Sequence, residues 1–306
     1  MPDNLIEQKP SQTALFTALR RALAHLAYGS EKFGADHLAI HFLPLSFRFF
    51  LKFEKIRANT REKLAAAFPG MNEYLIARTA FFDGLFLEAL QNGTPQIVLL
   101  GAGYDSRAYR FAGENRGSCV FELDAAPTQR RKVQCLKAAR IDVPEQVTFV
   151  PVNFNQEVLG EVLAQAGYRS DAKALFLWEG VSYYLEPAAV DATLAFISQA
   201  APGSQIAFDY AVPIRVENQG QYYGAKEFIE SMQRAHANEE IRFALADEEI
   251  GLFLEQRGLK LIQHLNHEEI ERAYLLNEGE SLLGQIPGFF RFVVASPGVC
   301  NTSGEF

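Results

Sequence analysis

From residue 96 onward, short apolar runs alternate with stretches of helical periodicity. Near-continuous apolar runs separated by helix-length segments are typical of parallel strands joined by crossover helices. The runs of the alternating part are Gln96–Leu100, Cys119–Asp124, Val147–Phe154, Ala174–Trp178 and Gln205–Tyr210. They predict an α/β fold with a doubly wound, mostly parallel sheet. Two further runs, Leu259–Leu265 and Phe289–Ser296, predict a closing antiparallel pair.

The chain before the first strand is expected to be helical. Apolar residues recur there at spacings of three and four, with breaks near Pro44 and Pro69. No Gly/Ser linker separates this front from the sheet, so the two should pack together. We expect residues 1–91 to form an N-terminal helical cap on a sheet domain of residues 92–306.

A polar insert follows the fifth strand. Residues 212–245 are rich in Gln, Glu and Tyr and interrupt the alternation. Because ligands of open α/β sheets enter at the carboxyl ends of the strands, we expect residues 15–68 and this insert to form a movable cover over that edge. Some side chains of the insert suit an acidic acceptor, namely Arg215, Tyr222, Tyr223 and Lys226. A solvated loop is the alternative.

The charge and hydropathy patterns exclude several classes of partner. The net charge of −8 disfavours a nucleic-acid binder, which needs concentrated positive charge. The most apolar stretch, Leu38–Leu51, is interrupted by Pro44 and Arg48 and is shorter than a membrane-spanning helix. The first residues lack the pattern of a signal peptide. We therefore expect a cytoplasmic protein with no membrane partner, and nothing in the pattern indicates an oligomeric state.

No metal site is expected. The three cysteines, Cys119, Cys135 and Cys300, are far apart and form no Cys-x-x-Cys pair. His37 and His41 lie four residues apart, but no Glu follows the first as in the zinc-protease motif. These histidines are therefore interpreted as ordinary surface or core residues.

The strongest local motif is IVLLGAGYDSRAYR, in which a strand leads through Gly101 and Gly103 into a helix. Such a turn brings free backbone N–H groups close to a ligand. The next strand ends in Asp124, at about the 20-residue spacing at which a carboxylate reaches a ribose hydroxyl. A nucleoside cofactor is therefore favoured. A dinucleotide fits less well, because Arg107 stands where the NAD fingerprint has a small residue.

Five segments resemble the leucine carboxyl methyltransferase-like family, in order and spacing: LLGAGYDSRAYR, FELDAAP, VPVNF, LWEGVSYYL and FDYA. The resemblance extends from about Asp36 to Pro297 and is strongest to the bacterial branch that includes polyketide O-methyltransferases. It implies a class I methyltransferase (Rossmann-like) fold with seven strands, the last one reversed, and S-adenosylmethionine as the methyl donor.

The resemblance also implies roles for single residues. Arg78 matches the arginine that holds the cofactor's carboxylate, Asp124 the acid that binds the ribose, and Glu179 a further cofactor contact. Gly101 would lie beside the methionine part, and Gly103 is a further cofactor-binding position. Asn153 and Phe154 occupy the adenine-contacting position. Asn153 departs from the usual Asp, although its amide oxygen can still accept a hydrogen bond from the adenine amino group.

Each of these roles has a simpler alternative. Arg78 could be a surface charge of a helix, Glu122 could replace Asp124 as the functional acid, and Glu179 could be a helix cap. Tyr183 and Tyr184 are candidates for the acceptor site, with core packing as the alternative.

The predicted activity is methyl transfer to an oxygen of a small metabolite or a peptide. A carboxylate is preferred over a hydroxyl, because a carboxylate is ionised at neutral pH and needs no general base. The alternatives are an NAD-dependent oxidoreductase and a non-catalytic S-adenosylmethionine-binding protein.

Overall fold

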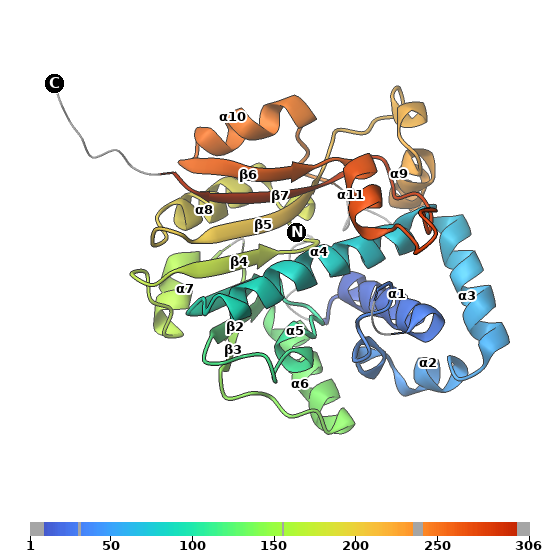
Figure 1. The fold of residues 1–306 in the computed structure, drawn as a ribbon, viewed down its shortest axis with the longest axis horizontal. Coiled ribbons are helices and arrows are strands. Elements are labelled where there is room, and N and C mark those ends of the chain that lie inside the picture. Colours follow the sequence, from blue (N-terminus) through green and yellow to red (C-terminus); the bar gives the residue numbers. More distant parts are fainter. Residues whose placement is uncertain (1–8, 30–31, 155, 235–240, 299–306) are drawn as a thin grey trace.

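A computed structural model describes residues 9–29, 32–154, 156–234 and 241–298. Its centre is a seven-stranded sheet in the order β3-β2-β1-β4-β5-β7-β6, with helices on both faces (Figure 1). The strands are β1 (Gln96–Leu100), β2 (Cys119–Asp124), β3 (Val147–Pro151), β4 (Ala174–Trp178), β5 (Gln205–Ala211), β6 (Leu259–Leu265) and β7 (Phe290–Pro297). The doubly wound architecture predicted from the sequence is confirmed.

The directions of the strands also agree with the prediction. β1 to β5 pair in parallel, and β7 runs antiparallel to both β5 and β6. The predicted third strand is too long, since β3 ends at Pro151 and not at Phe154. Beyond Pro151 the backbone N–H of Val152 still donates to the carbonyl of Asp124 at 3.0 Å, and the backbone N–H of Asn153 donates to the carboxylate of Glu157 at 2.8 Å.

Helices surround the sheet. The front of the chain forms α1 (Gln12–Tyr28), a short 3-10 helix η1 (Ala39–Phe42), α2 (Leu45–Phe50), α3 (Glu54–Ala67) and α4 (Met71–Gln91). The others are α5 (Arg107–Arg110), α6 (Ala126–Ala139), α7 (Leu159–Gln165), η2 (Ser182–Tyr184), α8 (Pro187–Ser198), η3 (Gln219–Gln221), α9 (Ala225–Arg234), η4 (Asp247–Glu249), α10 (Ile250–Glu255) and α11 (His267–Tyr274).

Two elements of the front pack in different ways. α4 crosses one face of the sheet and shares the main core with it, through residues such as Tyr74 and Phe82. α1 and η1 instead build a second core with Tyr104 and Leu136, which follow β1 and β2. The backbone carbonyl of Tyr104 accepts a hydrogen bond from Arg21 at 2.7 Å. α1 therefore lies against the carboxyl ends of the strands.

The insert after β5 touches the helical front. Phe228 on α9 is buried, and its ring lies 6.0 Å from that of Phe68 and 5.0 Å from that of Phe289. The backbone N–H of Leu245 donates to Ala211 at 3.0 Å. Residues 235–240 of the insert lie outside the described part of the chain.

Among the described residues, no helix is long and apolar enough to cross a membrane. The same residues hold no group of three His, Cys, Asp or Glu side chains suited to a metal ion. Cys119 is exposed and Cys135 is buried, both as free thiols. Cys300 lies outside the described residues.

Candidate functional site

The loop after β1 depends on its glycines. Gly101 and Gly103 have φ angles of 72° and 45°, which residues with a side chain rarely adopt. A Cβ on Gly101 would lie only 2.5 Å from the side chain of Val181, in the loop after β4. The loop is closed by the backbone N–H of Ala102, which donates to Leu123 at 2.7 Å. This arrangement brings the ends of β1, β2 and β4 together.

Asp124 lies at the carboxyl end of β2 and fixes this loop. Its carboxylate accepts hydrogen bonds from the backbone N–H groups of Gly103 at 2.5 Å and Ala125 at 2.7 Å. Burial raises the pKa of Asp124, and these two donors act in the opposite direction. The side chain is half-buried at the edge of the sheet, where a ligand can reach it.

Glu122, the alternative acid, lies in different surroundings. Its carboxylate is buried and lies 2.6 Å from the ammonium group of Lys132. It also accepts a hydrogen bond from the hydroxyl of Tyr109 at 2.9 Å. Glu122 is thus half of an internal ion pair, and the geometry favours Asp124 as the acid that faces a cofactor.

Asn153 and Phe154 follow β3 at the same edge. β3 pairs with β2 so that Pro151 lies opposite Asp124, which puts Asn153 two residues beyond that pair. Both Asn153 and Phe154 are half-buried, and Phe154 packs against the main core. Both residues therefore lie beside the end of β2, as an adenine contact requires.

Arg78 is buried on α4 and is not a surface charge. Its Nε lies 3.0 Å from Glu179, and its Nη1 lies 3.2 Å from Asp209. Burial alone would lower the pKa of Arg78, but Glu179 and Asp209 raise it well above the ordinary value. The hydroxyl of Tyr183 accepts a further hydrogen bond from Nη1 at 3.3 Å. Arg78 is therefore a fixed cation at the carboxyl edge.

Glu179, directly after β4, is held by a second arginine. Nη1 of Arg107 lies 2.7 Å from Glu179 and 2.5 Å from Asp105, while its Nε donates to Asp83 at 2.8 Å. The remaining nitrogen, Nη2, is buried without a hydrogen-bond partner among the described residues. Arg107 lies in an ion network that accommodates its bulk. Glu179 is not a helix cap.

Sequence reasoning assigned no role to Asp209 on β5 or Asp83 on α4. Asp209 is fully buried and accepts hydrogen bonds from Gly180 at 2.6 Å and from the hydroxyl of Tyr74 at 2.5 Å. The only sequence signal for Asp209 was its place in the FDYA segment. No sequence pattern pointed to Asp83, because its partners Arg107 and Arg110 lie 24 and 27 positions further along the chain.

The two candidate acceptor tyrosines lie in different surroundings. Tyr183 is buried, faces Arg78 and accepts a backbone hydrogen bond from Arg242 at its carbonyl, at 2.8 Å. Burial raises the pKa of Tyr183 well above its ordinary value. Tyr184 is half-buried, and its ring lies 4.5 Å from that of Tyr183. Core packing thus describes Tyr183, and Tyr184 stays a prediction for the acceptor site.

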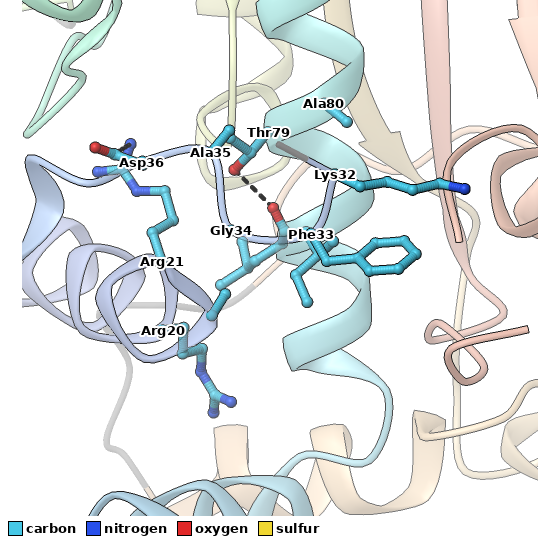
Figure 2. A pocket seen from close by; sticks show the side chains of 12 residues that line it. Arg20, Arg21, Lys32, Phe33, Gly34, Ala35, Asp36, Thr79 and Ala80 are labelled. Carbon is cyan, nitrogen blue, oxygen red and sulfur yellow. Dashed lines mark hydrogen bonds and ion pairs between the residues drawn. The ribbon is translucent and has the colours of Figure 1, made fainter. Parts of the chain in front are cut away.

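A small cavity lies between α1, the segment before η1 and α4 (Figure 2). Its volume of about 20 Å³ has room for about one water molecule. Figure 2 shows Arg21 extending toward Asp36, whose carboxylate is 3.2 Å away, while Arg20 points in another direction. This cavity is too small for an acceptor molecule.

Comparisons with known proteins show which family the chain resembles. The family model described as leucine carboxyl methyltransferase matches residues 14–198. A Bacillus subtilis protein named "Putative S-adenosyl-L-methionine-dependent methyltransferase YktD" is 30% identical over 210 residues, which are 68% of this chain and 67% of that protein. A Mycolicibacterium paratuberculosis protein named "Putative S-adenosyl-L-methionine-dependent methyltransferase" is 35% identical over 157 residues. These residues are 51% of this chain and 48% of that protein.

One solved structure shares the fold over nearly the whole chain. The crystal structure of a "putative methyltransferase" from Thermobifida fusca matches with a TM-score of 0.57 and 16% sequence identity. The match covers 97% of this chain and 98% of the Thermobifida fusca chain. At this identity the likeness concerns the fold alone. The family match and the sequence relatives identify an S-adenosylmethionine-dependent methyltransferase. Within that class, the chain belongs to the leucine carboxyl methyltransferase family.

Proposed function

We propose that this protein transfers the methyl group of S-adenosylmethionine to a carboxylate oxygen of a small molecule or a peptide. S-adenosylmethionine supplies a methyl group already activated on a positively charged sulfur. The protein's tasks are therefore to position the acceptor and to exclude water. The observation that carries the proposal is the row of polar residues along one sheet edge, from Asn153 through Asp124 to Glu179 and Arg78.

The chemistry of these residues fits the cofactor. The half-buried carboxylate of Asp124 suits two ribose hydroxyls, and the amide of Asn153 suits the adenine amino group. Arg78 presents a planar cation for the carboxylate of the methionine part. Gly101 lets the loop after β1 pack against Val181, because a Cβ at this position would meet the side chain of Val181. Glu179, held by Arg78 and Arg107, completes the row.

The acceptor preference follows from the groups near this edge. A hydroxyl acceptor needs a base, whereas a carboxylate is already ionised at neutral pH. The raised pKa of Tyr183 keeps its phenol protonated. Two histidines contact other groups, since His264 lies 3.0 Å from the hydroxyl of Tyr210 and His25 lies 2.7 Å from the carbonyl of Gly34. The description of the matching family names carboxyl methylation as well.

The helical front and the insert would cover this edge when an acceptor binds. Their contact through Phe68 and Phe228 is already formed. Arg215 and Lys226 are exposed on the insert and are available to an anionic group. Tyr223, also on the insert, is 47% exposed. These three side chains could therefore contribute to the choice of acceptor.

The proposal can be tested by the lability of the product. The purified chain is incubated with S-adenosylmethionine labelled in its methyl group and with a panel of carboxylic acids and peptides. A methyl ester releases labelled methanol in mild alkali, whereas a methyl ether does not. Alkali-labile label is the expected result, and an alkali-stable product would indicate a hydroxyl or amine acceptor.

A matched binding assay separates the remaining alternative. S-adenosylhomocysteine should raise the melting temperature, because a ligand bound only by the folded state stabilises that state by mass action. NAD at the same concentration should leave the melting temperature unchanged. A chain that binds S-adenosylhomocysteine but labels no acceptor in any cell extract would be a non-catalytic binding protein.

A further inference from the structure

Exposed apolar side chains gather in one short segment of the helical front. The aromatic–basic patch, residues 45–56, comprises α2 and the start of α3. Six of its large apolar side chains are between 36% and 77% exposed: Leu45, Phe47, Phe49, Phe50, Phe53 and Ile56. Elsewhere among the described residues, exposed large apolar side chains are scattered. A contiguous exposed apolar patch of this kind marks an interaction surface.

The patch is ordered by its own backbone. The N–H of Phe53 donates to Phe50 at 3.1 Å, and the guanidinium of Arg57 donates to the carbonyl of Leu51 at 3.0 Å. The side chain of Leu51 is buried and anchors the segment to the second core. The ring of Phe49 lies 5.7 Å from the rings of both Phe50 and Phe53. The exposed rings thus form a ready-made surface.

The charges around these rings identify the kind of partner. Arg48, Lys52 and Lys55 alternate with the aromatic residues, and Glu54 is the one acid of the patch. This is a local excess of positive charge in a chain whose net charge is −8. Apolar rings flanked by cations are typical of segments that lie in the interface of an anionic bilayer. A second copy of the chain suits this surface less well, because a twofold contact would oppose like charges.

We propose that the aromatic–basic patch docks on the surface of an anionic phospholipid bilayer. The expectation of no membrane partner rested on the lack of a spanning segment, and peripheral docking requires none. α1 lies against the carboxyl ends of the strands, and α2 and α3 belong to the same side of the molecule (Figure 1). Docking would therefore turn the carboxyl edge of the sheet toward the lipid.

The test measures cosedimentation of the whole chain with vesicles. One set contains phosphatidylcholine alone, and the other contains phosphatidylcholine mixed with phosphatidylglycerol. We expect binding to the mixed vesicles, little binding to phosphatidylcholine, and release at high salt because screening weakens surface charges. Phe49→Ser/Phe53→Ser and Lys52→Glu/Lys55→Glu should each weaken binding about tenfold or more.

Matched controls change exposed residues away from the patch. Leu252→Ser and Lys260→Glu should bind vesicles as the unchanged chain does. All variants should keep the melting temperature and S-adenosylhomocysteine affinity of the parent, because the altered side chains are exposed. The proposal is overturned if the parent does not bind the mixed vesicles or if the patch variants bind equally well. A dimer that Phe49→Ser/Phe53→Ser dissociates, without vesicle binding, would assign the patch to a second copy of the chain.

Discussion

The carboxylate of Asp209 accepts a hydrogen bond from the backbone N–H of Gly180 at 2.6 Å. This bond ties β5 to the loop after β4. The second carboxylate oxygen of Asp209 lies 3.2 Å from Nη1 of Arg78, and Nε of Arg78 contacts Glu179. The fully buried Asp209 thus helps to position Arg78 and Glu179 of the proposed cofactor site.

Asp209→Asn is expected to weaken S-adenosylhomocysteine binding about tenfold. The amide keeps the shape of the side chain but carries no charge to balance Arg78, and a hydrogen bond to a charged group contributes roughly 1.5–3 kcal/mol. Calorimetric titration measures the change. Asp171→Asn, at an exposed aspartate, is the matched control and should bind as the parent does. Equal affinities for Asp209→Asn and the parent would remove Asp209 from the site.

Substitutions of Asp124 and Glu122, the two acids of β2, should affect different properties: cofactor affinity for Asp124 and stability for Glu122. Asp124→Ala should weaken S-adenosylhomocysteine binding by roughly 1.5–3 kcal/mol, since a charged ribose acceptor is lost. Glu122→Gln should lower the free energy of unfolding and leave the affinity nearly unchanged, because Glu122 faces Lys132 in the interior. Titration and urea unfolding of both variants decide the assignment. A reversal of this pattern would make Glu122 the cofactor acid.

The ion pair of Glu122 and Lys132 should be costly to break from one side. Both side chains are 1% exposed. Lys132→Met leaves a buried carboxylate without its cation, so it should lower the free energy of unfolding by about 3–5 kcal/mol. The double variant Glu122→Leu/Lys132→Met should recover most of that loss. Urea unfolding of the parent, both single variants and the double variant completes the cycle. If the losses of unfolding free energy in the two single variants simply added in the double variant, Glu122 and Lys132 would not be coupled.

Stability at acid pH should depend on Asp105. Burial alone would raise the pKa of Asp105, but the cations Arg107, Lys132 and Arg21 together with a backbone hydrogen bond outweigh burial and lower the pKa from 3.8 to about 2. A depressed carboxyl pKa stabilises the folded state above pH 3.8, and this contribution is lost as the pH falls toward 2. It amounts to about 2 kcal/mol. Asp105→Asn should therefore flatten the fall in unfolding free energy over this range, as measured by urea unfolding at each pH.

The insert should influence the acceptor and not the cofactor. Arg215→Ser/Lys226→Ser removes two exposed cations, so KM for an anionic acceptor should rise about twofold to tenfold, the range expected for exposed ion pairs. The affinity for S-adenosylhomocysteine should stay the same. Arg116→Ser/Lys137→Ser removes two exposed cations elsewhere and keeps the same net charge. A similar rise in KM for both double variants would indicate a general effect of net charge, and the insert would then have no specific role in acceptor binding.

Much of the sheet could be predicted from local patterns. β1, β2 and β4 begin and end where predicted, because strands buried on both faces of a parallel sheet are mostly apolar. The end of β3 could not be predicted in this way. Phe154 ends the apolar run in the sequence, but β3 ends earlier, at Pro151, and the backbone N–H of Asn153 donates to the carboxylate of Glu157.

The sequence by itself determined the strands, the glycine turn at Gly101 and the acid at the end of β2, because each depends on residues close together in the chain. The tertiary structure alone decided which charges meet. Asp83, Arg107 and Glu179 come from α4, α5 and the loop after β4, and Asp209 reaches Arg78 across 131 positions of the chain. A charged side chain shows no partner in the sequence, since Coulomb attraction depends on distance in space. The fold brought these groups to within 3.2 Å of one another and left the rings of residues 45–56 exposed.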